Sequence, residues 1–136
     1  MTTTPTLETV RSPAARSLTS VSPEMASSIL SALADHFSEK IMTCTVTEAR
    51  TVEEISSSEK IPLSTCYRRM RELVDAGLIL VERIVITGSG KRYATYRSCF
   101  KSFRISSDFH GLSVEAEVNE DVADKLRDRW LSTRYA

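Results

Sequence analysis

The spacing of apolar residues changes at Gly77, and this change constrains the fold more than any other feature of the sequence. Before Gly77, the apolar residues Cys66, Met70 and Leu73 recur at intervals of four and three positions, as they do on one face of a helix. A helix is therefore predicted over residues 62–76, with Gly77 just past its end. After Gly77, apolar and polar residues alternate, which is the pattern of a half-buried strand. The predicted fold class is α+β.

Three further helices are predicted upstream of residues 62–76. The first begins at Ser22-Pro23-Glu24, which supplies an N-cap, a proline in the first turn and an acidic side chain near the positive end of the helix dipole. The second is predicted from Ser38 to about Glu48. The third begins at Thr51-Val52-Glu53-Glu54, a capping box. Because only a few residues separate this third helix from residues 62–76, the two form a helix-turn-helix.

Strands dominate the rest of the chain. The predicted strands are residues 79–86, 91–96, 100–106 and 113–118, with turns at residues 87–90 and 108–111. Asn119 is expected to cap a final helix, in which Val122, Leu126 and Trp130 lie on one side. The sequence thus predicts a helix-turn-helix and a β-hairpin, followed by a C-terminal strand pair and helix.

The N-terminal residues differ in composition from the rest. Residues 1–22 are rich in Ser, Thr and Pro and have few large apolar side chains, so we predict a disordered tail. Its arginines and scarcity of acidic residues are also typical of an organellar transit peptide. Residues 23–98 would form the main domain, and residues 99–136 a C-terminal extension for dimerisation. The longest aliphatic run, Leu78-Ile79-Leu80-Val81, is too short to span a bilayer, so we expect no membrane partner and a cytoplasmic location.

Basic residues are concentrated in one part of a chain whose net charge is zero. Residues 60–104 contain ten Lys and Arg against three Asp and Glu, whereas residues 24–59 and 105–136 are acidic. A local excess of positive charge is typical of a surface that binds nucleic acid. It is equally expected of a solvated face that pairs with the acidic flanks, so charge alone leaves both interpretations open.

The helix over residues 62–76 has an outer side suited to the major groove of DNA. Small hydroxyl side chains near its N-terminus would allow close approach, and guanidinium groups further along can contact guanine edges or phosphates. Two basic residues just past the Gly-rich turn of the hairpin would lie along the phosphate backbone. The predicted DNA-binding residues are Ser64, Thr65, Tyr67, Arg68, Arg69 and Arg71 on the helix, Lys60 before it, and Lys91 and Arg92 in the hairpin. The alternative is a solvated helix face with a local Arg71–Asp75 ion pair.

The segment over residues 64–78 reads Ser64-Thr65-Cys66-Tyr67-Arg68-Arg69-Met70-Arg71-Glu72-Leu73-Val74-Asp75-Ala76-Gly77-Leu78. It resembles the recognition-helix signature of ArsR-like winged helix-turn-helix transcription regulators. Ala32-Leu33-Ala34-Asp35 is similar to the first helix of that family, and Thr51-Val52-Glu53-Glu54-Ile55 to the helix before the recognition helix. Ile61-Pro62-Leu63-Ser64-Thr65 and Ser113-Val114-Glu115-Ala116-Glu117-Val118-Asn119 are similar to archaeal members. The resemblance extends over residues 24–119.

This resemblance implies a winged helix, with a three-helix core and a β-hairpin wing, that binds double-stranded DNA as a homodimer. The recognition helix would be residues 62–76 in the major groove, and the wing would be residues 79–96 on the backbone. We therefore expect a sequence-specific transcription regulator associated with the nucleoid, with contacts to the transcription machinery. The alternative is a winged helix that binds proteins within a transcription complex without reading DNA.

The sequence has no motif for catalysis or metal binding. The three cysteines Cys44, Cys66 and Cys99 lack the spacing of a zinc site, and the metal-binding positions of ArsR-like sensors are not occupied by Cys or His. His36 and His110 are predicted at a helix end and in a turn. No phosphate-binding loop, nucleophile elbow or zinc-protease motif is present. We expect no enzyme activity, no cofactor and no metal site.

Two apolar stripes are candidates for the dimer interface. One lies on the first helix and the other on the terminal helix, and we expect the dimer to form through both. The stripes are Ile29 and Leu33, and Val122, Leu126 and Trp130. The alternative is that the terminal helix packs on its own sheet, over Val114, Ala116 and Val118.

Overall fold

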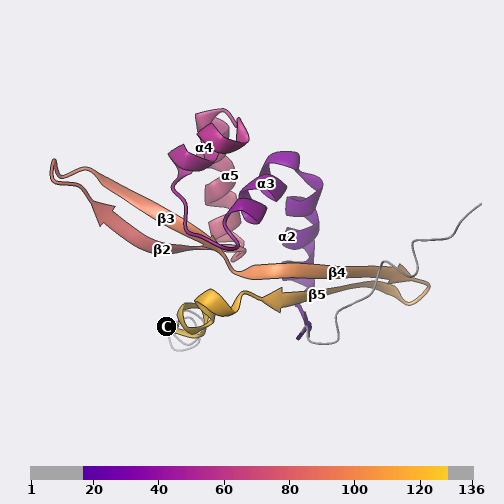
Figure 1. Ribbon diagram of the computed structural model, residues 1–136. Helices are drawn as coiled ribbons and strands as arrows, with labels where there is room; N and C mark the ends of the chain where they lie inside the picture. The colour runs from indigo at the N-terminus through magenta and orange to yellow at the C-terminus, as the bar shows by residue number, and fades with distance from the viewer. Residues whose placement is uncertain (1–16, 129–136) are drawn as a thin grey trace, which may run out of the picture.

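The computed structural model describes residues 17–128, and Figure 1 shows the arrangement of its elements. A short strand comes first, and four helices and then two hairpins follow it along the chain. The helices are α2 (Pro23–Ala34), α3 (His36–Cys44), α4 (Val52–Glu59) and α5 (Leu63–Asp75). The strands are β1 (Thr19–Ser20), β2 (Ile79–Ile86), β3 (Arg92–Ser98), β4 (Phe100–Asp108) and β5 (Gly111–Val118), and a 3₁₀ helix, η1 (Glu120–Val122), leads into a helical turn at residues 123–128.

The predicted helix starts are formed by the side chains that the sequence indicated. The Ser22 hydroxyl accepts a hydrogen bond from the backbone N–H of Met25 at 3.1 Å and caps α2. Thr51 and Glu54 form the complete capping box of α4. At the end of α5, Gly77 adopts a φ of +80°, a conformation that favours glycine.

Helix α3 is shorter and starts earlier than the predicted span from Ser38 to about Glu48. It begins at His36, because the Asp35 carboxylate accepts a hydrogen bond from the Ser38 backbone N–H at 2.9 Å and so acts as N-cap. It ends at Cys44, where the Thr45 hydroxyl donates to the backbone carbonyl of Ile41 at 2.9 Å. The β-branched residues beyond this point are poor helix formers, which accounts for the early end.

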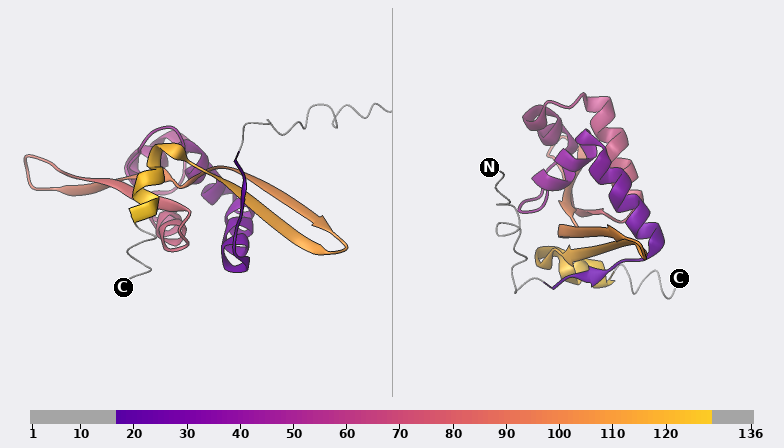
Figure 2. Two further views of the ribbon diagram at one scale, coloured as in Figure 1. Left: turned by 90° about the horizontal axis from the view of Figure 1, so that it is seen from below. Right: turned by 90° about the vertical axis from the view of Figure 1, so that its right-hand side faces the viewer.

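Helices α3, α4 and α5 pack together as a three-helix core, and α2 packs beside α3 (Figures 1 and 2). The side chains of Ile29, Ile41 and Ile55 are fully buried in this core, and Met70 nearly so. Burying an aliphatic side chain of this size stabilises the fold by about 1.5–3 kcal/mol. Helix α5 is therefore held by its apolar side against the other helices.

The two hairpins extend in opposite directions from the base of the helices (Figures 1 and 2). Strands β2 and β3 form one antiparallel pair, and an isolated β-bridge joins Arg50 to Tyr96 at its base. Strands β1, β5 and β4 form a separate sheet in that order. The structure confirms the predicted α+β fold, a winged helix-turn-helix with a C-terminal strand pair and helix.

Part of the predicted tail is ordered, so the prediction of disorder for residues 1–22 is wrong at residues 19–21. Thr19 pairs with Ala116 and Ser20 with Glu115, and the Val21 N–H donates to the carbonyl of Val114 at 3.3 Å. These bonds satisfy backbone groups along the outer edge of β5, which a composition-based argument does not consider. Residues 1–16 lie outside the described residues, as does Trp130.

The apolar stripes assigned to a dimer interface are largely used within one protomer. Ile29 is fully buried in the protomer's own core, and Leu33 packs against that core. Val122 and Leu126 are buried in the same cluster as Val114 of β5 and its neighbour Ala116. The described residues Ile29, Val122 and Leu126 are therefore not available to the dimer interface predicted through these stripes. The terminal segment contacts the base of the wing, where Asp121 pairs with Arg97 and Lys125 donates to the carbonyl of Glu82.

A buried polar junction connects the wing, the end of α3 and the terminal segment. Asn119 is almost fully buried, and its amide donates to the carbonyls of Val46 at 3.0 Å and Ser98 at 2.9 Å. The buried Arg97 donates to the carbonyls of Thr45 at 3.2 Å and Val46 at 2.7 Å. Arg97 also forms ion pairs with Asp121 of η1 at 2.8 Å and with Glu82 of β2 at 3.7 Å. This junction fixes the base of the wing relative to the helices.

Candidate nucleic-acid interface

Helix α5 has an apolar inner side and a polar outer side. Cys66, Met70 and Leu73 are buried against the other helices, as predicted. On the opposite side, Ser64, Tyr67, Arg68 and Arg71 are exposed and lie at helical spacing along one strip, which we call the outer strip. Thr65 is only half exposed, at the flank of this strip. The helix thus presents small hydroxyls near its start and two arginines further along.

The two arginines of the outer strip are not neutralised by any described part of the chain. No acidic side chain among residues 17–128 forms an ion pair with Arg68 or Arg71, and the local pair between Arg71 and Asp75 does not form. Both guanidinium groups are therefore free to contact an external partner.

Tyr67 of the outer strip is held by an acidic residue of α4. Its hydroxyl donates a hydrogen bond to the carboxylate of Glu53, which raises the pKa of Tyr67 to about 12 and lowers the pKa of Glu53. Glu53 lies within the capping-box segment of α4, and its contact with α5 arises only from the packing of α4 on α5. Glu53 therefore contributes negative charge beside the outer strip, and it orients the phenol ring of Tyr67.

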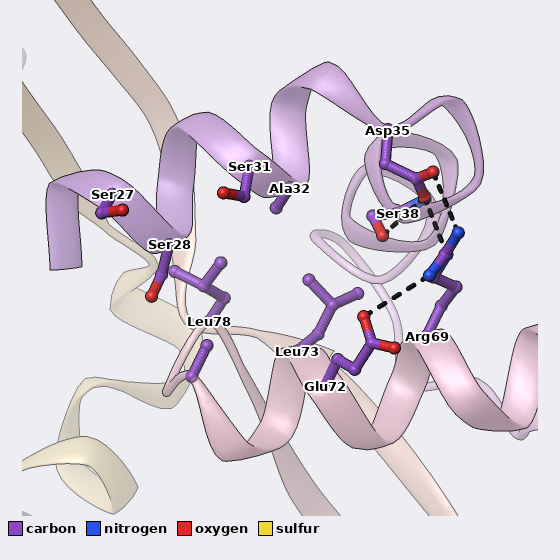
Figure 3. A pocket seen from close by; sticks show the side chains of 11 residues that line it. Ser27, Ser28, Ser31, Ala32, Asp35, Ser38, Arg69, Glu72, Leu73 and Leu78 are labelled. Carbon is purple, nitrogen blue, oxygen red and sulfur yellow. Dashed lines mark hydrogen bonds and ion pairs between the residues drawn. The ribbon is translucent and has the colours of Figure 1, made fainter. Parts of the chain in front are cut away.

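Arg69 does not lie in the outer strip, so its place among the predicted DNA-binding residues is not supported. It follows Arg68 by one residue, and the turn of about 100° per residue carries it toward the buried side. Its guanidinium forms two contacts with the Asp35 carboxylate, at 3.1 and 3.3 Å, and one with Glu72 at 3.5 Å (Figure 3). These contacts tie α5 to the junction of α2 and α3.

The Asp35–Arg69 pair lies at one end of a polar pocket of about 310 Å³ between α2 and α5 (Figure 3). Ser27, Ser28 and Ser31 of α2 line the rest of its wall, and Leu73 and Leu78 lie at its base. The pocket is on the side of α5 that faces away from the outer strip, so it does not contribute to that surface.

The Asp35 carboxylate should make stability depend on pH. Hydrogen bonding from the Ser38 backbone N–H, aided by the Ser38 hydroxyl and by Arg69 and opposed by burial, lowers the pKa of Asp35 from 3.8. A lowered folded-state pKa stabilises the fold above the unfolded value of 3.8, and this contribution is lost as the pH falls through the folded value. We expect Asp35→Ala to reduce the free energy of unfolding by about 0.5–2 kcal/mol at pH 7.

Chemical denaturation of both proteins from pH 7 to pH 2.5 checks this, because the difference between them should shrink below pH 3.8. Asp35→Asn is the matched control, since an asparagine keeps the cap but not the charge. A difference that stays constant over the whole range would contradict the assignment.

The wing presents its predicted basic residues near its tip. Gly90 adopts a φ of +83° in the turn, the Gly90 N–H donates to the Thr87 carbonyl at 2.9 Å, and the Lys91 N–H donates to the Thr87 hydroxyl at 3.1 Å. Lys91 and Arg92 are both exposed. Lys91 and Thr87 line a groove between the wing and α4, across from Glu53 and Thr51, whereas Arg92 lies opposite Ile86 in the ladder. Lys91 is thus brought beside the helix-turn-helix.

The structure separates the basic block of residues 60–104 into two groups. One group forms ion pairs with acidic residues of the flanks and of the wing base, and comprises Arg69, Arg97, Lys101 and Arg104. The other group is exposed and forms no ion pair with a described acidic residue, and comprises Lys60, Arg68, Arg71, Arg83, Lys91 and Arg92. Lys60 ends α4 in a left-handed conformation, with a φ of 57°. The second group lies on the helix-turn-helix and the wing.

Neither a metal site nor a membrane-spanning helix is found among residues 17–128. No three His, Cys, Asp or Glu side chains in this range are grouped so that they could hold a metal ion. No helix in the same range is long and apolar enough to cross a membrane. Burial raises the pKa of the Cys66 thiol, and it raises that of Cys44 to about 11, so neither thiol is activated as a nucleophile.

Comparison with known proteins gives a match over the helices and the start of the first wing strand. No curated protein matches the chain. A family model described as a helix-turn-helix domain matches residues 24–82, which cover α2 to α5 and the first half of β2. Residues 24–82 are therefore similar to the helix-turn-helix domains that this model describes, and the strands that follow complete a winged helix-turn-helix.

Proposed function

We propose that the protein binds double-stranded DNA in a sequence-specific manner and regulates transcription. The observation that carries the proposal is the outer strip of α5, where Arg68 and Arg71 are exposed on the second helix of a helix-turn-helix and form no ion pair with residues 17–128. In such motifs the second helix enters the major groove, and an arginine can donate two hydrogen bonds to a guanine edge. Ser64 near the helix start allows close approach to the DNA.

The wing is proposed to contact the backbone. Lys91 lies beside α4 at the tip of the hairpin, and Arg92 follows it, so both can reach phosphates next to the groove that α5 occupies. Lys60, in the turn before α5, would contact the DNA backbone on the other side of the groove. Thr65, at the flank of the outer strip, would make a phosphate contact more readily than a base contact.

The residues quoted for the resemblance support an ArsR-like regulator of the archaeal type. Such a regulator would act as a homodimer, because one winged helix reads only a few base pairs and two copies related by a twofold axis read a palindrome. The two recognition helices would then lie about 34 Å apart, one turn of DNA. The role is one of binding, without catalysis or a cofactor, at the nucleoid in the cytoplasm and in contact with the transcription machinery.

A winged helix that binds a protein partner is the second candidate. Leu63 and Tyr67 are large side chains exposed at the start of α5, and such side chains are common at protein interfaces. This candidate does not require unpaired arginines on the same strip. The two functions differ in salt dependence, because only DNA binding releases counterions from phosphates.

Replacing Lys91 with alanine should weaken binding to every DNA sequence by a similar factor. A phosphate contact carries no sequence information, so a preferred site and a scrambled duplex should lose affinity alike. The slope of log affinity against log salt should fall by about 0.9 for the lost contact. Fluorescence anisotropy with both duplexes at several salt concentrations measures this. Loss confined to the preferred site would contradict the backbone role of Lys91.

A further inference from the structure

The β4–β5 hairpin carries an apolar face that continues past the helices. Directly opposed residues of an antiparallel pair lie on the same face, so Phe103, Ala116, Ile105, Val114, Ser107 and Leu112 share one side. Ala116 and Val114 are buried in the core, whereas Ile105 and Leu112, nearer the tip, are exposed. Phe109 in the turn is fully exposed. Figures 1 and 2 show that the end of this hairpin extends beyond α2.

This part of the hairpin has no further strand beside β4. The sheet order places β4 at an edge, with β5 on its other side, and residues 104–108 are all exposed. An isolated two-stranded ribbon is only marginally stable in water, and an open strand edge readily pairs with another chain. An apolar face and an open edge thus occur together on residues 104–112.

We propose that this hairpin pairs with the same hairpin of a second copy, so that β4 lies antiparallel to β4 across a twofold axis next to Ile105. In this register Ile105 lies against Ile105 of the second copy, and Phe103 faces Ser107 of the second copy. The two apolar faces then become continuous, and the two three-stranded sheets join as one. The inference rests on the homodimer of the proposed function and supplies its interface.

The charges on β4 favour a second copy over an unrelated partner. Arg104 and Asp108 are four residues apart on the same face of this strand. Antiparallel pairing about Ile105 sets Arg104 opposite Ser106 of the second copy and diagonal to its Asp108, twice by symmetry. Arg104 can make this contact because its side chain is exposed and its ion pair with Glu115 is long, at 4.0 Å. The same register also sets Arg104 diagonal to Arg104 of the second copy, so one repulsive contact stands against two attractive ones, and the edge is on balance complementary in charge to itself.

The location of the hairpin also suits a dimer that binds DNA. It extends away from the wing, so pairing there leaves the outer strip of α5 and the wing tip uncovered (Figure 1). The exposed apolar residues of the wing, Ile84 and Ile86, lie at the other end of the molecule. They supply a matched control, because Ile84 and Leu112 are both 53% exposed.

Analytical ultracentrifugation of the full chain without DNA tests the inference. At micromolar concentration the wild type should sediment with twice the 15.2 kDa chain mass. Leu112→Lys and Ile105→Lys should raise the dimer dissociation constant by at least about tenfold. Ile84→Lys should leave it unchanged. Both hairpin residues are solvent-exposed in the protomer, so circular dichroism melting should confirm that these variants still fold.

A wild type that stays at the chain mass would overturn the inference, and so would a dimer that survives Leu112→Lys or dissociates with Ile84→Lys. A cysteine at position 105 tests the register independently, since it should form a disulfide with its copy under mild oxidation. A cysteine in place of Ser89 at the wing tip should not. None of these measurements uses DNA, so a dimer through this hairpin that fails to bind duplex would refute the proposed function alone.

Discussion

Replacing Arg68 and Arg71 together with alanine is expected to reduce the affinity for the preferred DNA site by about 2–6 kcal/mol, since each arginine that reads a base edge contributes about 1–3 kcal/mol. Both side chains are exposed on the outer strip and neither forms an ion pair with a described acidic residue, so their loss should leave the fold intact. Each single variant should lose about half of this amount and should discriminate less between bases at one position of the site.

Fluorescence anisotropy with the preferred duplex measures the loss, and thermal melting shows whether the double variant is folded. Arg127→Ala is the matched control, because Arg127 is an exposed arginine on the terminal segment whose ion pair among residues 17–128 is with Asp124. Its affinity should equal that of the wild type. If the double variant binds as tightly as the control, α5 does not read the groove.

Arg97→Ala should have the largest effect on stability among the basic residues. The Arg97 side chain is 8% exposed and donates to two backbone carbonyls at the end of α3. Removing it takes one hydrogen bond from a charged donor away from each carbonyl, and such a bond contributes about 1.5–3 kcal/mol. Neither carbonyl is left unsatisfied, because Val46 still accepts from the Asn119 amide and Thr45 from the Ser98 N–H. The ion pair to Asp121 adds little, because that carboxylate is 56% exposed and screened by solvent. We expect a total loss of about 2–4 kcal/mol in the free energy of unfolding.

Urea denaturation measures this loss, with Arg83→Ala as control. Arg83 is a neighbouring exposed arginine of β2 without an ion pair to a described acidic residue, so its replacement should change stability by less than about 0.5 kcal/mol. At a temperature where the Arg97 variant is folded, its DNA affinity should be close to that of the wild type. A stable Arg97→Ala variant with weakened DNA binding would contradict the purely structural role of Arg97.

The helix ends and the outer strip could be predicted because they depend on local spacing. The Ser22 cap, the Thr51–Glu54 capping box and Gly77 each act within a few residues, so the sequence carries their full signal. The exposed position of Arg68 and Arg71 follows from the spacing of the buried residues Cys66 and Met70 on the same helix. Such features require no knowledge of how the helices pack.

Three other features depend on contacts between distant segments and could not be predicted. Helical spacing places Arg69 toward the buried side, but its partner Asp35 lies 34 residues earlier and is brought to it only by the packing of α5 on the junction of α2 and α3. Arg97 was counted with the basic block, but the crossing of β3 under α3 buries it. Thr19 and Ser20 form a strand only because β5 presents an open edge to them.

The contact between Glu53 and Tyr67 has the same origin. Fourteen residues separate the two, and only the packing of α4 on α5 brings them together. Under the proposed function, the negative charge of Glu53 lies near the DNA phosphates. Its repulsion of phosphates should disfavour any docking in which the outer strip is not aligned with the groove.

The salt dependence of binding to duplex DNA tests the central claim most directly. If the unpaired basic residues on α5 and the wing contact phosphates, log affinity should fall linearly with log salt, by about 0.9 for each phosphate contact. A preferred duplex should remain bound more tightly than a random one at every salt concentration. Binding that does not change between low and high salt, or no binding to any duplex at low salt, would contradict the account.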